Sequence, residues 1–288
     1  MRLRTLPLSL SGIIAGMALA AGAGRIGLFT AITLVCTTIL LQILSNLSNE
    51  LGDTLHGTDT ADRMGIHYSI QDGEMTVPEM KRIIAAVALL CCGCGLLMIL
   101  ASFGTLFAPL PLLFIGLGAC AVWAAMHYTL GDNPYGYRGL GDLSVFIFFG
   151  LVSVLGAAFI CVHEFEPVWG LPAAAIGCFS IGVLNVNNIR DMKTDAVNRT
   201  TVAIRLGARR ARIYQTVLIS LGWLLMLAYA LISRSPLAGY LHFITLPLFL
   251  LHLRGVWTKQ DRGLDPMLPM LVMSTFAMSL LFAAGNII

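Results

Sequence analysis

About nine long apolar stretches, separated by charged or Gly/Pro-rich connections, constrain the fold of this chain more than any other feature. A helix that crosses the hydrocarbon core of a bilayer needs roughly 20 apolar residues. With 57% hydrophobic and 11% charged residues, the chain is also too apolar for an ordinary soluble protein. We therefore expect an all-α membrane protein of about nine transmembrane helices, forming one domain over residues 1–288. The expected spans are Leu6 to Ala23, Leu28 to Ser48, Ile83 to Ser102, Leu110 to Thr129, Leu143 to Val162, Val168 to Asn187, Ile213 to Ile232, Gly239 to Leu253 and Met267 to Ile287.

The distribution of basic residues predicts how these spans are oriented. If the spans alternate in direction, all of the 18 Lys and Arg residues except Arg25 and Arg234 lie on the same side as the N-terminus. Lys and Arg accumulate in cytoplasmic loops. The N-terminus is therefore expected in the cytoplasm and the C-terminus outside, in a multi-pass protein of a bacterial inner membrane.

The acidic residues follow the same partition. Of the 15 Asp and Glu residues, only Glu164 and Glu166 fall on the outer side. The rule that orients membrane proteins depends on Lys and Arg, so it does not explain where the acidic residues lie. A surface that merely attracted anionic lipids would need basic residues alone. The cytoplasmic side is therefore expected to bind something that requires carboxylates.

Two of the predicted spans end in polar clusters with helical spacing. The first cluster occupies positions i, i+3, i+4 and i+7 at the end of the second span: Asn46, Asn49, Glu50 and Asp53. The second occupies positions i, i+3 and i+7 at the end of the sixth span, with Asn187 alongside: Asn188, Asp191 and Asp195. Both clusters end even-numbered spans, so they should face one another at the cytoplasmic side. Such groups at membrane depth are costly unless they line a wet cavity, which makes them candidates for function.

Opposed carboxylate and amide oxygens suit a hard cation, and magnesium is usually shared between protein carboxylates and substrate phosphates. Two acidic clusters would repel each other without cations between them, so a magnesium-bound diphosphate is the expected ligand. Basic residues that could grip its oxygens follow the clusters, although the same residues also suit a topology signal: Arg63, Lys193, Arg199 and Arg205.

Other ligand classes find less support. No P-loop or GxGxxG fingerprint opens a helix, so neither a nucleotide nor a nucleic-acid partner is expected. Four glycines inside the predicted spans are interpreted as helix-packing glycines: Gly93, Gly95, Gly116 and Gly118.

The two polar clusters resemble the motifs of the UbiA superfamily of intramembrane prenyltransferases. The stretch from Asn49 to Asp53, Asn-Glu-Leu-Gly-Asp, is similar to the family's first motif, Asn-Asp-x-x-Asp. Asp191-Met-Lys-Thr-Asp195 is similar to its second motif, Asp-x-x-x-Asp. Glu50 departs from the pattern, because Asp is commonest there, so Glu50 is the least certain ligand.

Further segments resemble the menaquinone branch of this family, the 1,4-dihydroxy-2-naphthoate prenyltransferases. They are Gly57-Thr-Asp59, Tyr128-Thr-Leu-Gly131, the loop from Gly136 to Asp142, and the run from Arg199 to Gly207. The similarity extends from Leu6 to about Arg212, whereas the last three spans carry no motif. The loop's glycines would let the backbone approach a ligand closely. Arg138 would suit the acceptor's carboxylate, although an interfacial turn with Tyr137 in the aromatic belt fits equally well.

The resemblance implies a role for each candidate residue. The Mg²⁺ ligands would be Asn49, Glu50, Asp53, Asp191 and Asp195. The substrates, a polyprenyl diphosphate and 1,4-dihydroxy-2-naphthoate, would be bound by Asn46, Arg63, Tyr137, Asn188, Lys193 and Arg199. The catalytic residues would be Arg138 and a general base, which would be either Asp59 or Asp142. The loop from Arg63 to Lys81 would cap the site, and the prenyl tail would lie in a groove that opens to membrane lipid.

The resemblance also implies the reaction, in which prenyl transfer with loss of carbon dioxide yields demethylmenaquinol. Two alternatives stay open. A 4-hydroxybenzoate or other aromatic prenyltransferase would share the fold and the metal site. An ion-coupled secondary transporter could also use intramembrane Asp and Asn residues, although transporters place them near the bilayer centre.

Overall fold

The computed structural model describes residues 5–57, 75–197 and 199–287. Asp59, Arg63 and most of the predicted cap loop lie outside these ranges. Within them, nine helical segments are long and apolar enough to cross a membrane, as predicted. Five of these segments are single helices: α1 (Leu6–Ala23), α2 (Leu28–Leu55), α3 (Val77–Phe103), α4 (Pro109–His127) and α10 (Ala208–Ile232).

The other four segments combine shorter elements. The fifth runs from α5 (Gly141–Val145) through η3 (Phe146–Val152), a π-helix, into α6 (Ser153–Val162). The 3₁₀ helices η4 (Pro167–Trp169), η5 (Leu237–Thr245) and η6 (Asp261–Leu264) precede α7 (Gly170–Arg190), α11 (Leu246–Thr258) and α12 (Met267–Ile287), respectively. Three short elements lie in the connections: η2 (Tyr135–Arg138), α8 (Met192–Asp195) and α9 (Val202–Leu206).

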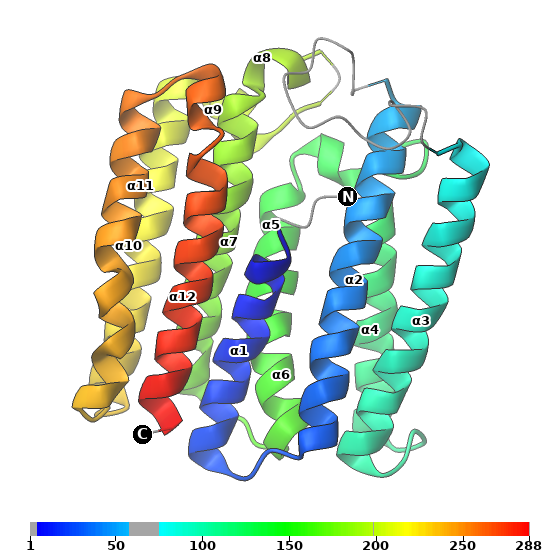
Figure 1. The fold of residues 1–288 in the computed structure, drawn as a ribbon, viewed down its shortest axis with the longest axis vertical. Helices are drawn as coiled ribbons and strands as arrows, with labels where there is room; N and C mark the ends of the chain where they lie inside the picture. The colour runs from blue at the N-terminus through cyan, green and yellow to red at the C-terminus, as the bar shows by residue number, and fades with distance from the viewer. Residues whose placement is uncertain (1–4, 58–74, 198, 288) are drawn as a thin grey trace.

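The spans run side by side in one bundle, with α7 at its centre (Figure 1). Helix α7 packs against α10, α12, α1 and the α5–α6 segment, whereas α3 packs mainly on α2 and α4. The apolar window of the α7 span is 67% buried, compared with 11% for α4. Large side chains from α7, α11 and α12 fill the centre, among them Phe179, Phe249 and Phe282. The outer helices therefore present apolar side chains to lipid, while α7 supplies the interior.

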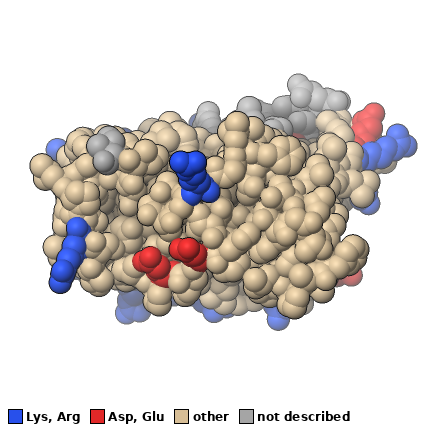
Figure 2. All heavy atoms as spheres, turned by 90° about the horizontal axis from the view of Figure 1, so that it is seen from below, with Lys and Arg blue, Asp and Glu red and all other residues tan. Residues whose placement is uncertain are grey.

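The two ends of the bundle differ in charge. The short elements α8 and α9 lie at the upper end in Figure 1, together with the last turns of α2 and α7. Seen from the lower end, where α1 turns into α2, the molecule shows few charged side chains on a mostly neutral surface (Figure 2). At the upper end, basic residues belong to the last turn of α7, to α8 and to α9: Arg190, Lys193 and Arg205. The assignment of that end to the cytoplasm stays a prediction.

Helix α2 is longer than predicted. It continues past Ser48 to Leu55, so the whole first polar cluster lies inside a regular helix. Helix α7 ends at Arg190, where Asp191 leaves the helical conformation with φ −92° and ψ 8°. Asp195 in α8 stays linked to Asp191 through its backbone N–H, which donates to the Asp191 carbonyl at 2.9 Å. The second cluster therefore bends away from the axis of α7.

Candidate active site

Both polar clusters contribute to one cavity of about 730 Å³. From α2 the cavity is lined by Asn46, Asn49 and Asp53. From α7 and the residue that follows it, the lining residues are Asn187, Asn188, Arg190 and Asp191. The prediction that the two clusters face a common space is therefore confirmed.

Glu50 and Asp195 do not line this cavity. Both are buried, with exposed fractions of 2% and 3%. Glu50 lies in α2 together with Asp53, and Asp195 lies in α8, which directly follows Asp191. Among the predicted metal ligands, the structure brings Asn49, Asp53 and Asp191 to the cavity wall.

Away from the polar end, the cavity continues between apolar side chains of the membrane-spanning helices. Leu34 of α2, Met98 of α3 and Ile160 of α6 line it, together with Phe114 and Leu117 of α4. Two phenylalanines of the π-helical segment η3, Phe148 and Phe149, also contribute. One continuous space therefore joins a charged end to an apolar interior, which suits an amphipathic ligand.

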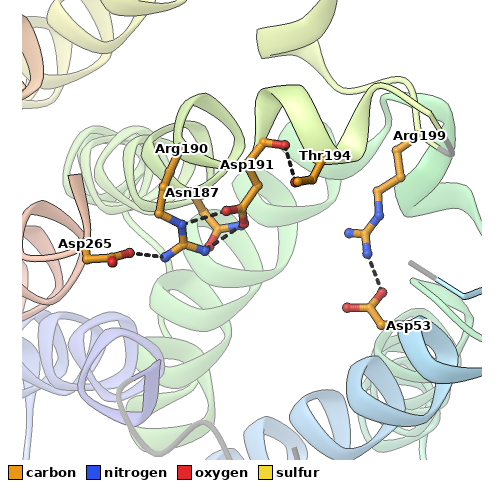
Figure 3. Close-up of polar contacts among 7 residues, drawn as sticks. All are labelled: Asp53, Asn187, Arg190, Asp191, Thr194, Arg199 and Asp265. Atoms are coloured by element: carbon orange, nitrogen blue, oxygen red, sulfur yellow. Dashed lines mark hydrogen bonds and ion pairs between the residues drawn. The ribbon is translucent and has the colours of Figure 1, made fainter. Parts of the chain in front are cut away.

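Asp53 is held by two side chains from other parts of the chain. Arg199 Nη2 donates to Asp53 Oδ1 at 2.6 Å, and the Tyr137 hydroxyl donates to the same oxygen at 2.8 Å. The guanidinium of Arg199 also lies over the Tyr137 ring, 4.4 Å from its centroid. Figure 3 shows Arg199 reaching toward Asp53 from the segment after α8. The loop that contains Tyr137 is thereby joined to the first motif and to the segment that follows the second motif, although these three residues lie far apart in the sequence.

Asp191 is held by its own neighbour, Arg190. The Nε and Nη2 atoms of Arg190 donate to the two carboxylate oxygens of Asp191, each at 2.7 Å. Arg190 Nη2 also donates to Asn187 Oδ1 at 2.9 Å, and Nη1 donates to Asp265 Oδ1 at 3.1 Å (Figure 3). This fork geometry fixes the orientation of the Asp191 carboxylate.

Two uncharged groups complete the polar end. Asn49 Oδ1 accepts a hydrogen bond from Thr129 Oγ1 at 3.1 Å. Tyr135, which also lines the cavity, donates its hydroxyl to the Ala124 carbonyl at 2.8 Å and contacts Ser144 Oγ at 3.0 Å. Burial raises the pKa of the Tyr135 phenol, and the hydrogen bond with Ser144 offsets only part of this rise. Tyr135 therefore stays neutral at physiological pH.

The oxygen atoms at this end suit magnesium. Within residues 5–57, 75–197 and 199–287, no three His, Cys, Asp or Glu side chains are grouped so that they could hold a metal on their own. Magnesium, however, is commonly bound by one or two carboxylates, with substrate phosphates and water supplying the remaining ligands. The carboxylates of Asp53 and Asp191 and the amide of Asn49 fit that arrangement.

Several predicted site residues lie elsewhere. Arg138 is exposed, and its carbonyl accepts a hydrogen bond from Arg205 Nη2 at 3.3 Å. Asp142 Oδ2 accepts a hydrogen bond from the Tyr214 hydroxyl at 2.9 Å. Lys193, with 82% of its side chain exposed, pairs with an aspartate in η6. None of these three lines the cavity, and their predicted roles stay predictions.

The structure also places residues at the cavity that the sequence did not single out. Arg190, Arg262 and Asp265 all line it. Arg190 directly precedes Asp191, and this position was the one available signal for it. Arg262 and Asp265 belong to the last span, where no motif points to a site.

The interpretation of the membrane glycines as packing glycines is wrong at three positions. A Cβ atom added at Gly93, Gly116 or Gly118 would meet no atom within 4 Å, whereas one at Gly95 would contact Thr37 at 3.7 Å. Gly118 lines the cavity, so at this position the open space is the interior of the site.

Comparisons with known proteins agree with this description. The sequence model of the UbiA prenyltransferase family matches residues 9–280. The chain is 39% identical to the 1,4-dihydroxy-2-naphthoate octaprenyltransferase of Escherichia coli (strain K12) over 288 residues, which cover 99% of this chain and 92% of that protein.

Two solved structures share the fold. The apo structure of a UbiA homolog from Aeropyrum pernix K1 has a TM-score of 0.71 at 16% identity, covering 99% of this chain and 98% of that one. A UbiA homolog from Archaeoglobus fulgidus, bound to GPP and Mg²⁺, has a TM-score of 0.60 at 14% identity, covering 97% and 98%. At these identities the likeness extends to the fold alone.

Proposed function

The chain belongs to the UbiA prenyltransferase family, and from this membership we propose that it transfers a polyprenyl group from a polyprenyl diphosphate to 1,4-dihydroxy-2-naphthoate, with Mg²⁺ and with loss of carbon dioxide. The relative from Escherichia coli that is 39% identical carries the name of that activity. The family match does not favour the transporter alternative.

One observation carries the proposal for this chain. Asp53, at the end of α2, and Asp191, at the end of α7, line the same cavity, and that cavity continues between apolar side chains into the membrane part of the bundle. A prenyl diphosphate changes along its length in the same way as the cavity, from an anionic head to an apolar tail. The shape and chemistry of the cavity therefore support a substrate of this class.

The charged end would bind the diphosphate head. Magnesium held by Asp53, Asp191 and Asn49 would supply positive charge to the leaving diphosphate; a homolog of the same fold from Archaeoglobus fulgidus was solved with GPP and Mg²⁺ bound. Arg199 already lies at the cavity wall in contact with Asp53, so its guanidinium can donate to a phosphate oxygen without leaving the site. Tyr137 keeps Arg199 in place by supporting its planar face.

The apolar part would bind the prenyl tail and exclude water from the reacting carbon. The C–O bond between the first prenyl carbon and the diphosphate breaks, and the electron pair leaves with the diphosphate. The ring carbon of the naphthoate that bears the carboxylate forms the new C–C bond. Loss of carbon dioxide returns an electron pair to the ring, and tautomerisation gives demethylmenaquinol. Dry surroundings protect the electron-deficient prenyl carbon from attack by water.

The general base has less support than the metal ligands. Asp142 accepts a hydrogen bond from Tyr214 and does not line the cavity, so its position gives no support to a role in removing the phenolic proton. Asp59, the other candidate, lies outside the described residues. The proposal therefore rests on the two aspartates and the cavity rather than on an assigned base.

The proposal is tested with the purified protein in detergent. We would incubate it with geranylgeranyl diphosphate, 1,4-dihydroxy-2-naphthoate and Mg²⁺, and analyse the products by mass spectrometry. Parallel reactions contain EDTA, or 4-hydroxybenzoate in place of the naphthoate. We expect a prenylated, decarboxylated product that requires the naphthoate and disappears with EDTA.

Each other result would change the conclusion. Product from 4-hydroxybenzoate alone would replace the acceptor and keep the prenyl transfer. Product that persists in EDTA would contradict the role of magnesium. No product from either acceptor, with the protein intact by size-exclusion chromatography, would contradict the proposed activity.

A further inference from the structure

Two ion pairs connect the end of α7 and α8 to the segment that begins the last span. Arg190 pairs with Asp265 at 3.1 Å, and Lys193 pairs with Asp261 at 3.1 Å. The first pair lies at the cavity wall, where both residues are lining residues. The second is at the surface, with side chains 82% and 59% exposed. The same two segments are thus joined once inside the site and once outside it.

We propose that Asp265 is a positioning residue of the site, which acts through Arg190 to determine how readily Asp191 is released to bind a cation. This inference rests on the proposed function, because it assumes that Asp191 is a ligand of the magnesium diphosphate. It goes beyond that function by assigning a role to the last span, which carries no motif.

The hydrogen bonds of Arg190 give the reason. Its Nε and Nη2 atoms occupy both carboxylate oxygens of Asp191. A cation bound at Asp191 must compete with this bidentate contact. When Arg190 releases the carboxylate of Asp191, its guanidinium needs another hydrogen-bond acceptor, because a partly buried charge without an acceptor is unfavourable.

Asp265 and Asn187 already provide such acceptors. Asp265 Oδ1 accepts from Nη1, which is not engaged by Asp191, and Asn187 Oδ1 shares Nη2. With these contacts kept, Arg190 stays paired while the Asp191 carboxylate turns to the cavity. When Asp265 loses its charge, Asp191 is the one carboxylate among the described residues that still pairs with Arg190. The Arg190–Asp191 pair then tightens, and cation binding weakens.

The measurement is the binding of Mn²⁺, in the presence of inorganic diphosphate, followed by electron paramagnetic resonance of the free ion. For the Asp265→Asn variant we expect the apparent Kd for Mn²⁺ to rise about three- to tenfold, in the range of a partly exposed ion pair. The Asp261→Asn variant is the matched control. It removes the same charge from the same segment, but at the exposed pair with Lys193, and its apparent Kd should stay within about twofold of the wild type.

A second pair of variants separates action through Arg190 from a direct effect of the Asp265 charge. In an Arg190→Gln background, Asp265→Asn should leave the apparent Kd unchanged, because the residue through which it acts is gone. If Arg190→Gln does not fold, Arg190→Lys replaces it. Lys keeps the charge but not the fork, and the effect of Asp265→Asn should again shrink.

Three results would overturn the inference. They are an unchanged Kd in Asp265→Asn, an equal change in Asp261→Asn, or an undiminished effect of Asp265→Asn in the Arg190 background. If the wild type itself bound no Mn²⁺ with diphosphate, the metal site of the proposed function would fail, and the role of Asp265 with it. Binding by the wild type with no difference in Asp265→Asn would overturn the inference alone.

Discussion

At Asp53, a single carboxylate oxygen accepts hydrogen bonds from a tyrosine hydroxyl and from a guanidinium. Tyr137 therefore contributes in two ways. Its hydroxyl orients Asp53, and its ring supports Arg199. These two contributions can be separated by substitution, because phenylalanine keeps the ring and leucine removes both groups.

We expect Tyr137→Phe to lower kcat/KM for the prenyl diphosphate by about three- to tenfold, the range for the net contribution of one typical hydrogen bond. Tyr137→Leu should lower kcat/KM by about a further two- to fivefold, because it also removes the cation–π contact. Steady-state assays of both variants check this order. Equal activities for the two variants would contradict a role for the ring.

The carboxylates of Asp53 and Asp191 should matter more than any neutral group. Asp53→Asn and Asp191→Asn keep the size of the side chains but remove their charge. We expect turnover to fall by at least about 100-fold in each, as when preorganised charge at a reacting group is lost. Initial rates in purified protein of normal elution volume test this, with Asp261→Asn as the charge-matched control. Wild-type turnover in both variants would refute the metal site.

Among the helices, α4 contributes little to the core and much to the cavity wall. Its cavity side carries small residues, including Gly118, whereas Gly116 two positions away does not line the cavity. Neither glycine has an atom within 4 Å of an added Cβ. Gly118 lies ten residues before Tyr128, which places it roughly 15 Å along the helix from the polar end.

We expect Gly118→Leu to reduce prenyl transfer from geranylgeranyl diphosphate at least about tenfold relative to transfer from geranyl diphosphate, because an overpacked wall cannot accommodate the far end of a long tail. Gly116→Leu is the matched control, with the same added volume outside the cavity, and should leave the ratio unchanged. Competition assays with mixed diphosphates measure this ratio directly. An equal loss for both chain lengths in Gly118→Leu would argue against a tail in this part of the cavity.

The helices were easier to predict than the contacts between them. Apolar runs and the spacing of polar residues are local signals, so the nine spans and the two clusters could be predicted from short windows. The contact between Arg190 and Asp265 joins residues 75 positions apart, and no local pattern marks it. For Gly118, the sequence could not distinguish a neighbouring helix from a cavity, because both favour a small residue.

The interior of the whole bundle combines elements from both halves of the chain. Helices α1, α2, α4 and α5–α6 line the cavity together with α7 and the start of α12. The polar end of the cavity is lined by residues at the ends of α2 and α7, and these helix ends lie at the upper end of the bundle together with α8 and α9 (Figure 1). The site is therefore expected to receive its water-soluble acceptor from the cytoplasm and its prenyl substrate from the membrane.

This orientation predicts the behaviour of reporter fusions. Alkaline phosphatase fused after Ile288 should be active and green fluorescent protein at the same place dark, because the nine spans found among the described residues put the C-terminus outside when the N-terminus is inside. Fusion after Lys259, in the connection between α11 and η6, should give the opposite pair of results. The reverse pattern at both positions would invert the topology.

The ion pair between Asp53 and Arg199 can form only after both residues have been synthesised. The two residues are 146 positions apart. At about 5–20 residues per second, a ribosome needs roughly 7–30 s to add the second after the first. During that interval α2 must reach the membrane with its carboxylates still lacking the guanidinium that later neutralises one of them. The polar end of α2 should therefore remain at the water interface until Arg199 has been added, which happens after the sixth span and before the last three.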